Sequence, residues 1–183
     1  MKIIHQIKET LSSIVPFDKK EEEHLRFAKE WVNSGGGIFR IIKPATPDPH
    51  LVAYFLLLDP LQGKVLLVDH KKVGLWLPTG GHVELDEYPK ETVEREVFEE
   101  LSIQADFLLS NSFFLTVTKT VGQTAGHTDV SFWCLLNGSA NKAYCFDEEE
   151  FSQIRWFSPS DHINLLILIC KDASKNSKSL ISF

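Results

Sequence analysis

The sequence predicts an α+β protein in which helices cover a mixed β-sheet. Segments typical of strands and of helices are interleaved along the chain, but they do not alternate strictly as in a parallel βαβ fold. The chain has 183 residues, of which 43% are hydrophobic. That is enough to form one domain with a substantial core. The composition also excludes a disordered or low-complexity chain.

Two helices are expected within residues 1–35. Leu25, Ala28 and Trp31 recur there at helical spacing. Asp18, followed three residues later by Glu21, resembles a capping box at the start of the second helix. Glycines and prolines dominate the next segment, which we interpret as a linker. We therefore predict an N-terminal helical extension over residues 1–37 and a main domain over residues 38–173.

The main domain is expected to contain five strands and two helices. The strands are predicted at residues 50–58, 64–69, 107–121, 129–136 and 154–157, which are rich in β-branched and aromatic residues. A helix is predicted at residues 89–102, with Pro89 in its first turn. A last helix should begin near Ser158, and residues 174–183 are expected to form a frayed tail.

Charge and cysteine content restrict the function. The net charge of −6 argues against a broad nucleic-acid-binding surface. It remains compatible with a phosphorylated small molecule when a divalent cation supplies positive charge. Three widely spaced cysteines do not form a disulfide framework, which indicates a cytoplasmic protein. No apolar run is long enough to cross a membrane, so no membrane partner is expected, and a homodimer is left open.

An acidic helix face carries the most informative pattern in the sequence. Glu96, Glu99 and Glu100 fall on one face of the predicted helix at residues 89–102. Like charges at this spacing repel each other, so this arrangement does not stabilise the helix by itself. Mg²⁺ or Mn²⁺ would reverse the sign of the interaction, because both ions prefer oxygen ligands. Arg95 is suited to orient one of these carboxylates, and Gly80 allows close approach of the backbone.

This segment resembles the Nudix box, Gly-x5-Glu-x7-Arg-Glu-U-x-Glu-Glu-x-Gly-U, where U is a bulky aliphatic residue. The matching residues are Gly81, Glu87, Arg95, Glu96, Val97, Glu99, Glu100 and Ile103. The one departure is Ser102, which stands where the pattern has Gly. Ser102 should therefore end the helix at some conformational cost, without removing a metal ligand.

The resemblance implies an α/β/α sandwich around a mixed sheet and a metal-dependent nucleotide pyrophosphatase. By position in the box, Glu99 and Glu100 correspond to metal ligands, and the Gly80 carbonyl is a further ligand. Glu96 corresponds to a ligand or the general base, and Arg95 to its orienting partner. The catalytic residues implied are thus Arg95, Glu96 and Glu99, with magnesium or manganese as cofactor. Glu87 would support the loop or bind a second ion.

The reaction implied by the resemblance is hydrolysis of a diphosphate bond. The substrate would be a nucleoside diphosphate linked to another moiety, with nucleoside triphosphates as the default. Cations would neutralise the phosphates and activate a water molecule, which attacks phosphorus in line. Motifs typical of Nudix enzymes specific for ADP-ribose, diadenosine polyphosphates or NADH are absent from the sequence. The sequence therefore does not identify the nucleotide.

Four residues outside the acidic helix are candidates for substrate contact. His82 would contact a phosphate or form a surface hydrogen bond. Trp76 would stack on a base or pack against the N-terminal helices. His127 and Asp129 should point to the same side of a strand. There Asp129 would complete a metal shell, act as a base, or only cap the strand.

Two other functions known for Nudix-like folds require different residues from hydrolysis. A catalytically silent Nudix nucleotide sensor would typically lack carboxylates of the box, whereas all four are present here. An isopentenyl diphosphate isomerase would need a catalytic cysteine near the box, and none lies between residues 1 and 130. Hydrolysis is therefore the favoured interpretation.

Overall fold

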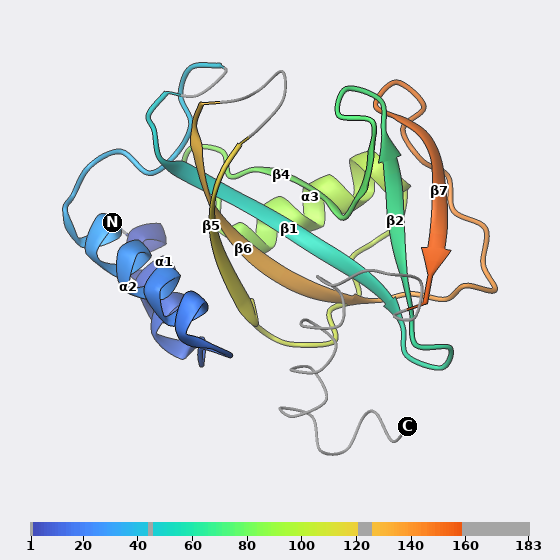
Figure 1. The fold of residues 1–183 in the computed structure, drawn as a ribbon, viewed down its shortest axis with the longest axis horizontal. Helices are drawn as coiled ribbons and strands as arrows, with labels where there is room; N and C mark the ends of the chain where they lie inside the picture. The colour runs from blue at the N-terminus through green and yellow to red at the C-terminus, as the bar shows by residue number, and fades with distance from the viewer. Residues whose placement is uncertain (1, 44–45, 121–125, 159–183) are drawn as a thin grey trace.

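A computed structural model describes residues 2–43, 46–120 and 126–158 of the chain. These residues form three helices and seven strands (Figure 1). The helices are α1 (Lys2–Ser13), α2 (Lys19–Asn33) and α3 (Pro89–Leu101). The strands are β1 (His50–Asp59), β2 (Lys64–His70), β3 (Leu75–Leu77), β4 (Thr79–His82), β5 (Phe114–Lys119), β6 (Thr128–Asn137) and β7 (Phe151–Phe157).

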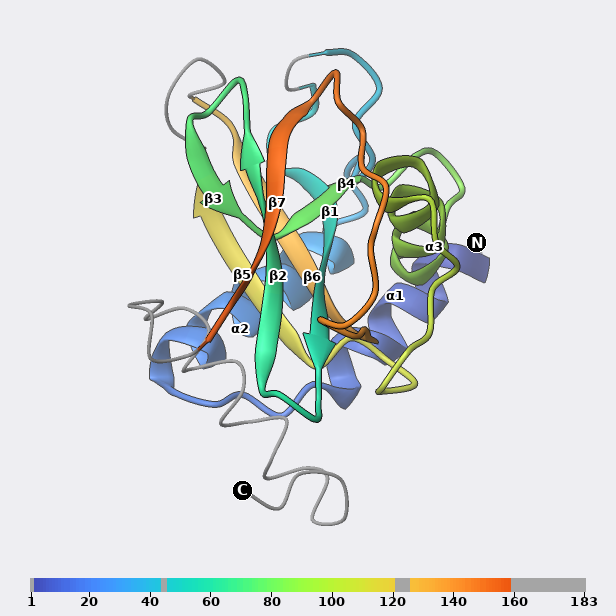
Figure 2. The ribbon, with the colours of Figure 1, turned by 90° about the vertical axis from the view of Figure 1, so that its right-hand side faces the viewer.

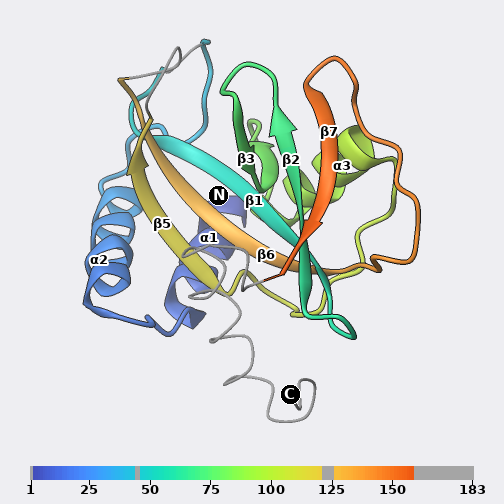
Figure 3. The same cartoon turned by 45° about the vertical axis from the view of Figure 1, so that its right-hand side comes forward.

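The strands form one mixed sheet, as predicted. Its main order is β3-β2-β1-β6-β5, while β4 pairs with β1 and β7 pairs with β2. β1 and β6 run parallel in a register that places His50 opposite Asp129, and the remaining pairings of described strands are antiparallel. Figure 3 shows β2 and β7 together at one end of the sheet and β5 beside α2 at the other. The expected α+β fold is confirmed.

The two faces of the sheet carry separate hydrophobic clusters. Leu51, Ala53 and Phe55 of β1 pack with apolar residues from all three helices. Leu56 and Leu58 point to the other face, where they pack with residues of β2, β5 and β6. The described helices therefore contribute to one face, and α3 passes behind β1 in Figure 1. Figure 2 shows the same arrangement from the side.

The N-terminal helices share the core of the sheet. Asp18 caps α2 by accepting a hydrogen bond from the Glu21 amide at 2.8 Å. Glu21 departs from the expected capping box, because its carboxylate accepts hydrogen bonds from the amides of Phe17 (2.7 Å) and Leu115 (3.1 Å). Glu21 is only 2% exposed. A buried carboxylate thus joins α2 to the backbone of β5.

Several element boundaries differ from the prediction. The third predicted strand begins at Phe114, because Phe107 forms only an isolated bridge with Leu136. The last strand begins at Phe151, earlier than predicted. β3 and β4, which flank Pro78, were not predicted, because these short strands depend on pairing with β2 and β1.

The helix expected after Ser158 and the tail expected at residues 174–183 lie outside the described residues. Among the helices that the structure describes, none combines the length and apolar character needed to span a membrane.

Candidate active site

The apolar residues that α3 buries determine on which side of the helix its carboxylates lie. Val93, Val97 and Leu101 are fully buried against the sheet. The helix begins at Pro89, where the Glu91 carboxylate accepts a hydrogen bond from the Tyr88 amide at 2.8 Å. It ends at Ser102, whose φ of 53° is left-handed. Ser102 therefore ends the helix as expected, in a conformation that favours Gly.

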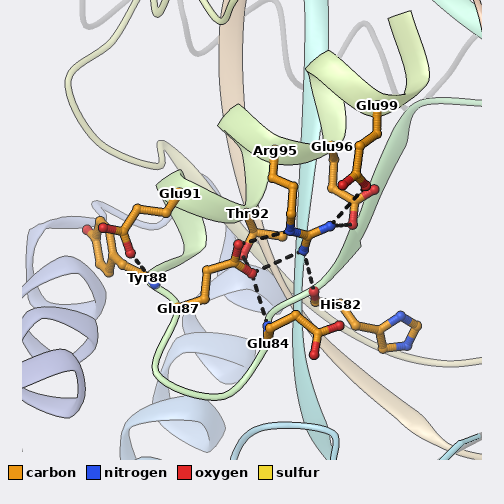
Figure 4. A network of polar contacts seen from close by, with 9 residues as sticks. All are labelled: His82, Glu84, Glu87, Tyr88, Glu91, Thr92, Arg95, Glu96 and Glu99. Atoms are coloured by element: carbon orange, nitrogen blue, oxygen red, sulfur yellow. Dashed lines mark hydrogen bonds and ion pairs between the residues drawn. The ribbon is translucent and has the colours of Figure 1, made fainter.

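Arg95 is the centre of the polar network in Figure 4. Its Nε and Nη2 donate to the two carboxylate oxygens of Glu87 at 3.0 and 3.1 Å. Its Nη1 donates to Glu96 at 2.7 Å and to Glu99 at 3.3 Å, and Nη2 also donates to the His82 carbonyl at 3.2 Å. One planar guanidinium thus fixes three carboxylates and the backbone of β4.

Glu87 fastens the loop before α3. Besides its contacts with Arg95, it accepts hydrogen bonds from the Thr92 hydroxyl at 2.8 Å and the Glu84 amide at 3.0 Å. Burial by itself would raise the pKa of Glu87. Hydrogen bonds from Arg95, Glu84 and Thr92 outweigh this effect and hold the pKa below its ordinary value. The carboxylate is consequently ionised at neutral pH.

The Glu96 carboxylate packs against Gly81, the first glycine of the Nudix box. A Cβ atom on Gly81 would lie 1.8 Å from Oε1 of Glu96, so only glycine leaves room for this carboxylate. Burial raises the pKa of Glu96, and the hydrogen bond from Arg95 opposes that shift. Gly80 is equally constrained, because its φ is +150° and a Cβ there would lie 2.2 Å from the Ala53 carbonyl.

Glu100 and Glu99 differ strongly in exposure. Glu100 is 7% exposed, and its Oε2 has no hydrogen-bond partner within the described part of the chain. Burial raises the pKa of Glu100 to about 8, and the charges of Glu96 and Glu150 add to this shift, while hydrogen bonding to Thr79 and to the Gly80 backbone opposes it. The Glu99 side chain is 57% exposed. The face therefore presents one buried carboxylate, whose Oε2 lacks a hydrogen-bond partner, and one solvent-accessible carboxylate.

Three of the four candidates for substrate contact meet on the other face of the sheet. Gly81 faces Glu96 on α3, so the next residue of β4, His82, points to the opposite face. There His82 lies close to His127, Asp129 and His50. Of these residues, only His50 was not predicted as a site residue. Burial, together with the charge of Arg40, lowers the pKa of His82 to about 3, so its ring is neutral.

The strand register explains this second group. Asp129 lies opposite His50 in the parallel β1–β6 pair, and His82 lies opposite Val52, two residues from His50. Side chains two residues apart along a strand share a face, so His50, His82 and Asp129 lie on the same face of the sheet. The one signal in the sequence was a histidine at the start of the first predicted strand.

Trp76 lies apart from both groups. Its ring packs edge-on against Phe157 with a centroid distance of 5.1 Å. It belongs to the second hydrophobic cluster rather than to the cluster that includes the N-terminal helices. The expected packing of Trp76 against the N-terminal helices is therefore wrong.

Fold and site together define a mixed-sheet protein with an acidic loop–helix site. The chain belongs to the Nudix family, because the model of the NUDIX domain matches residues 48–178, well over half of its length. The family consists generally of pyrophosphohydrolases. No curated protein matches the sequence significantly.

Solved structures show the same fold. A NUDIX-family hydrolase from Clostridium perfringens is 22% identical, with a TM-score of 0.53, covering 69% of this chain and 97% of its own. The MutT protein of Methanosarcina mazei Go1 is 19% identical, with a TM-score of 0.54 and coverages of 72% and 99%. The NUDIX domain of Shewanella oneidensis NrtR, solved with ADP ribose, is 19% identical, with a TM-score of 0.52 and coverages of 72% and 93%. At these identities the likeness concerns the fold alone.

Proposed function

We propose that this Nudix protein hydrolyses a diphosphate bond in a nucleoside diphosphate linked to another moiety, with nucleoside triphosphates as the default substrates. One observation carries the proposal. Glu100 is buried beside Glu96 with a carboxylate oxygen that has no hydrogen-bond partner in the described ranges. Leaving such a group unsatisfied is costly. A divalent cation shared by the two carboxylates would remove that cost.

The donor set fits magnesium or manganese. Glu96, Glu99 and Glu100 would hold the cation, with the Gly80 carbonyl as a further ligand. All four donors are oxygens, which these ions prefer. A bound cation neutralises phosphate oxygens and lowers the pKa of a water ligand.

Arg95, Glu96 and Glu87 have separate roles in the proposed reaction. Arg95 holds Glu96 in one orientation through a 2.7 Å hydrogen bond. Glu96 would either bind the cation or accept the proton from the attacking water. In the second role its raised pKa makes it a stronger base than an exposed carboxylate. Glu87 is assigned to the loop, since its oxygens already accept hydrogen bonds from Arg95, Thr92 and Glu84.

A pyrophosphatase screen tests this proposal. Nucleotide classes would be incubated with the protein and Mg²⁺ or Mn²⁺, and phosphate release measured. Glu99→Gln and Glu100→Gln should each lower kcat by roughly 100-fold or more, because the loss of a ligand weakens the cation that activates water. Glu94→Gln is the matched control, since Glu94 is an exposed residue of the same helix. Near-normal turnover in either active-site variant would exclude that residue as a ligand.

The same screen separates hydrolysis from nucleotide sensing. A sensor would bind nucleotides, which calorimetry detects, without releasing phosphate from any class. The presence of all four carboxylates of the box favours hydrolysis: Arg95 bonds to Glu87, Glu96 and Glu99, and Glu100 lies close enough to Glu96 for their charges to interact.

A further inference from the structure

A group of three histidines and one aspartate, buried except for the partly exposed His82, lies on the sheet face opposite α3. His50 begins β1, His82 ends β4, His127 precedes β6, and Asp129 lies within β6. One potential ligand atom from each residue lies within 4.8 Å of the other three. His50 is fully buried, His127 is 5% exposed and Asp129 is 7% exposed. The proposed chemistry at the carboxylates of α3 does not use this group.

The hydrogen bonding of His50 leaves a lone pair directed into the group. Its Nδ1 lies 2.9 Å from the Pro47 carbonyl, which can only accept, so Nδ1 carries the proton. In the neutral ring Nε2 is then unprotonated, and it faces Oδ1 of Asp129 at 3.4 Å. Both atoms are buried and have no hydrogen-bond partner among the residues described. Two facing acceptors repel each other unless a proton or a cation lies between them.

His127 repeats this arrangement from the other side. The Thr120 hydroxyl donates to the His127 carbonyl at 3.2 Å, so its oxygen can accept from Nδ1 of the His127 ring at 3.1 Å. The Nε2 lone pair of His127 then faces Oδ1 of Asp129 at 3.3 Å. Histidines that bind metals are typically anchored in this way, with the outer ring nitrogen donating to an oxygen.

The spacing of the ligand atoms suits a tetrahedral ion. With metal–ligand bonds of about 2.0–2.1 Å, two ligands of a tetrahedral zinc site lie about 3.3–3.4 Å apart. The two contacts of Asp129, at 3.4 Å to His50 and 3.3 Å to His127, have this length. These two pairs of ligand atoms therefore already have the spacing that a tetrahedral ion requires.

His82 would be the fourth ligand. Its ring lies 5.0 Å from the His50 ring, and its Nε2 lies 3.1 Å from Nη1 of Arg40. A guanidinium can only donate, so the His82 nitrogen acts as an acceptor here. Full coordination through this nitrogen would require His82 to exchange Arg40 for the metal.

We propose that His50, His82, His127 and Asp129 bind a transition-metal ion of the zinc class, at a site separate from the carboxylates of α3. Three imidazoles and one carboxylate suit Zn²⁺ or Co²⁺ better than Mg²⁺, which prefers oxygen ligands. Four protein ligands are a feature of structural zinc sites. The ion would tie the start of β1 to the end of β4 and the start of β6.

Co²⁺ and Zn²⁺ titrations test the site without any measurement of turnover. Protein treated with a chelator would be titrated with Co²⁺ alone, and the visible absorption of tetrahedral Co²⁺ recorded. We expect the intense tetrahedral absorption to saturate at one equivalent and Zn²⁺ to abolish it, whereas Co²⁺ at the oxygen ligands of α3 would absorb only weakly. His127→Gln and Asp129→Asn should weaken Co²⁺ binding by at least about 100-fold, because each removes a direct ligand. Circular dichroism would confirm that both variants fold.

Two controls separate this site from other sources of metal binding. His5→Gln removes an exposed histidine of α1 that is not a member of the group, and Glu99→Gln changes the proposed catalytic site. Both should retain Co²⁺ affinity within about twofold. If a cluster variant fails to fold, His82→Gln provides the same test at a partly exposed position.

Two results would overturn the proposal. One is a wild-type protein that develops no tetrahedral Co²⁺ absorption, which would leave a shared proton between His50 and Asp129. The other is a cobalt spectrum that disappears in Glu99→Gln but persists in His127→Gln. Neither result bears on whether the protein hydrolyses nucleotides, so the two proposals can fail independently.

Discussion

The carboxylate of Glu96 occupies the space that a side chain on Gly81 would fill. A Cβ at this glycine would lie 1.8 Å from Oε1 and 2.3 Å from the carboxyl carbon of Glu96. Arg95 holds the same oxygen from the other side at 2.7 Å. The position of Glu96 is thus fixed both by a hydrogen bond and by the absence of a side chain.

Gly81→Ala should therefore displace Glu96 and impair catalysis. A shift of about 1 Å in a catalytic group can lower the rate by roughly 100-fold, so we expect kcat to fall by that order. The measurement is steady-state hydrolysis with Mg²⁺ on the best substrate of the screen. Gly36→Ala is the control, because the nearest atom to a Cβ there, the Ser34 hydroxyl oxygen, is 3.7 Å away. Full activity in Gly81→Ala would refute the placement of Glu96.

Replacement of Arg95 by lysine should reduce kcat more than it raises KM. Lysine keeps the charge but cannot donate simultaneously to both oxygens of Glu87 and to Glu96. Glu96 would lose its fixed orientation, and a kcat decrease of about 10-fold or more is expected. Arg26→Lys, at an exposed site on α2, should leave both constants unchanged. An Arg95→Lys enzyme with normal kcat would remove the orienting role.

Metal affinity should depend on pH through Glu100. Burial raises the pKa of Glu100 from its ordinary value of 4.5 to about 8. The metal-free folded state therefore holds a proton that the unfolded chain releases above pH 4.5, so this group lowers stability as pH rises from about 4.5 to 8. A cation must displace that proton below pH 8, so affinity should rise with pH and level off above about 8.

Calorimetric titration of Mg²⁺ or Mn²⁺ between pH 6 and 9 would measure this dependence. The slope should approach tenfold per pH unit on the acid side of the pKa. In Glu100→Gln, which cannot ionise, the remaining binding should show a smaller slope. An equal slope in wild type and variant would assign the linked proton to another group.

Loss of the Glu21 carboxylate should destabilise the fold. Glu21→Ala removes the acceptor for the amides of Phe17 and Leu115, and each unsatisfied amide costs about 1–3 kcal/mol if it stays buried. We expect the free energy of unfolding to fall by about 2 kcal/mol or more in urea denaturation. Glu23→Ala, at an exposed position of the same helix, should change it by less than about 0.5 kcal/mol. A loss that small in Glu21→Ala would show that water replaces the carboxylate.

The sequence by itself determined the helical part of the site. The spacing of Glu96, Glu99 and Glu100 predicted a shared face, and the buried positions of Val93 and Val97 fix that face as expected. Ser102 ends the helix where the pattern predicted. These features were accessible because helical geometry relates residues three and four apart, so a local pattern fixes their relative positions.

Only the tertiary structure decided which residues from distant parts of the chain come into contact through strand pairing. His50 meets Asp129 because β1 and β6 are parallel neighbours in one particular register. Glu21 bonds to Leu115 across 94 positions of the chain. Alternation along a strand predicts which residues share a face, but not which strand lies beside it or in what register. That choice depends on packing of the whole core, which no local pattern in the sequence encodes.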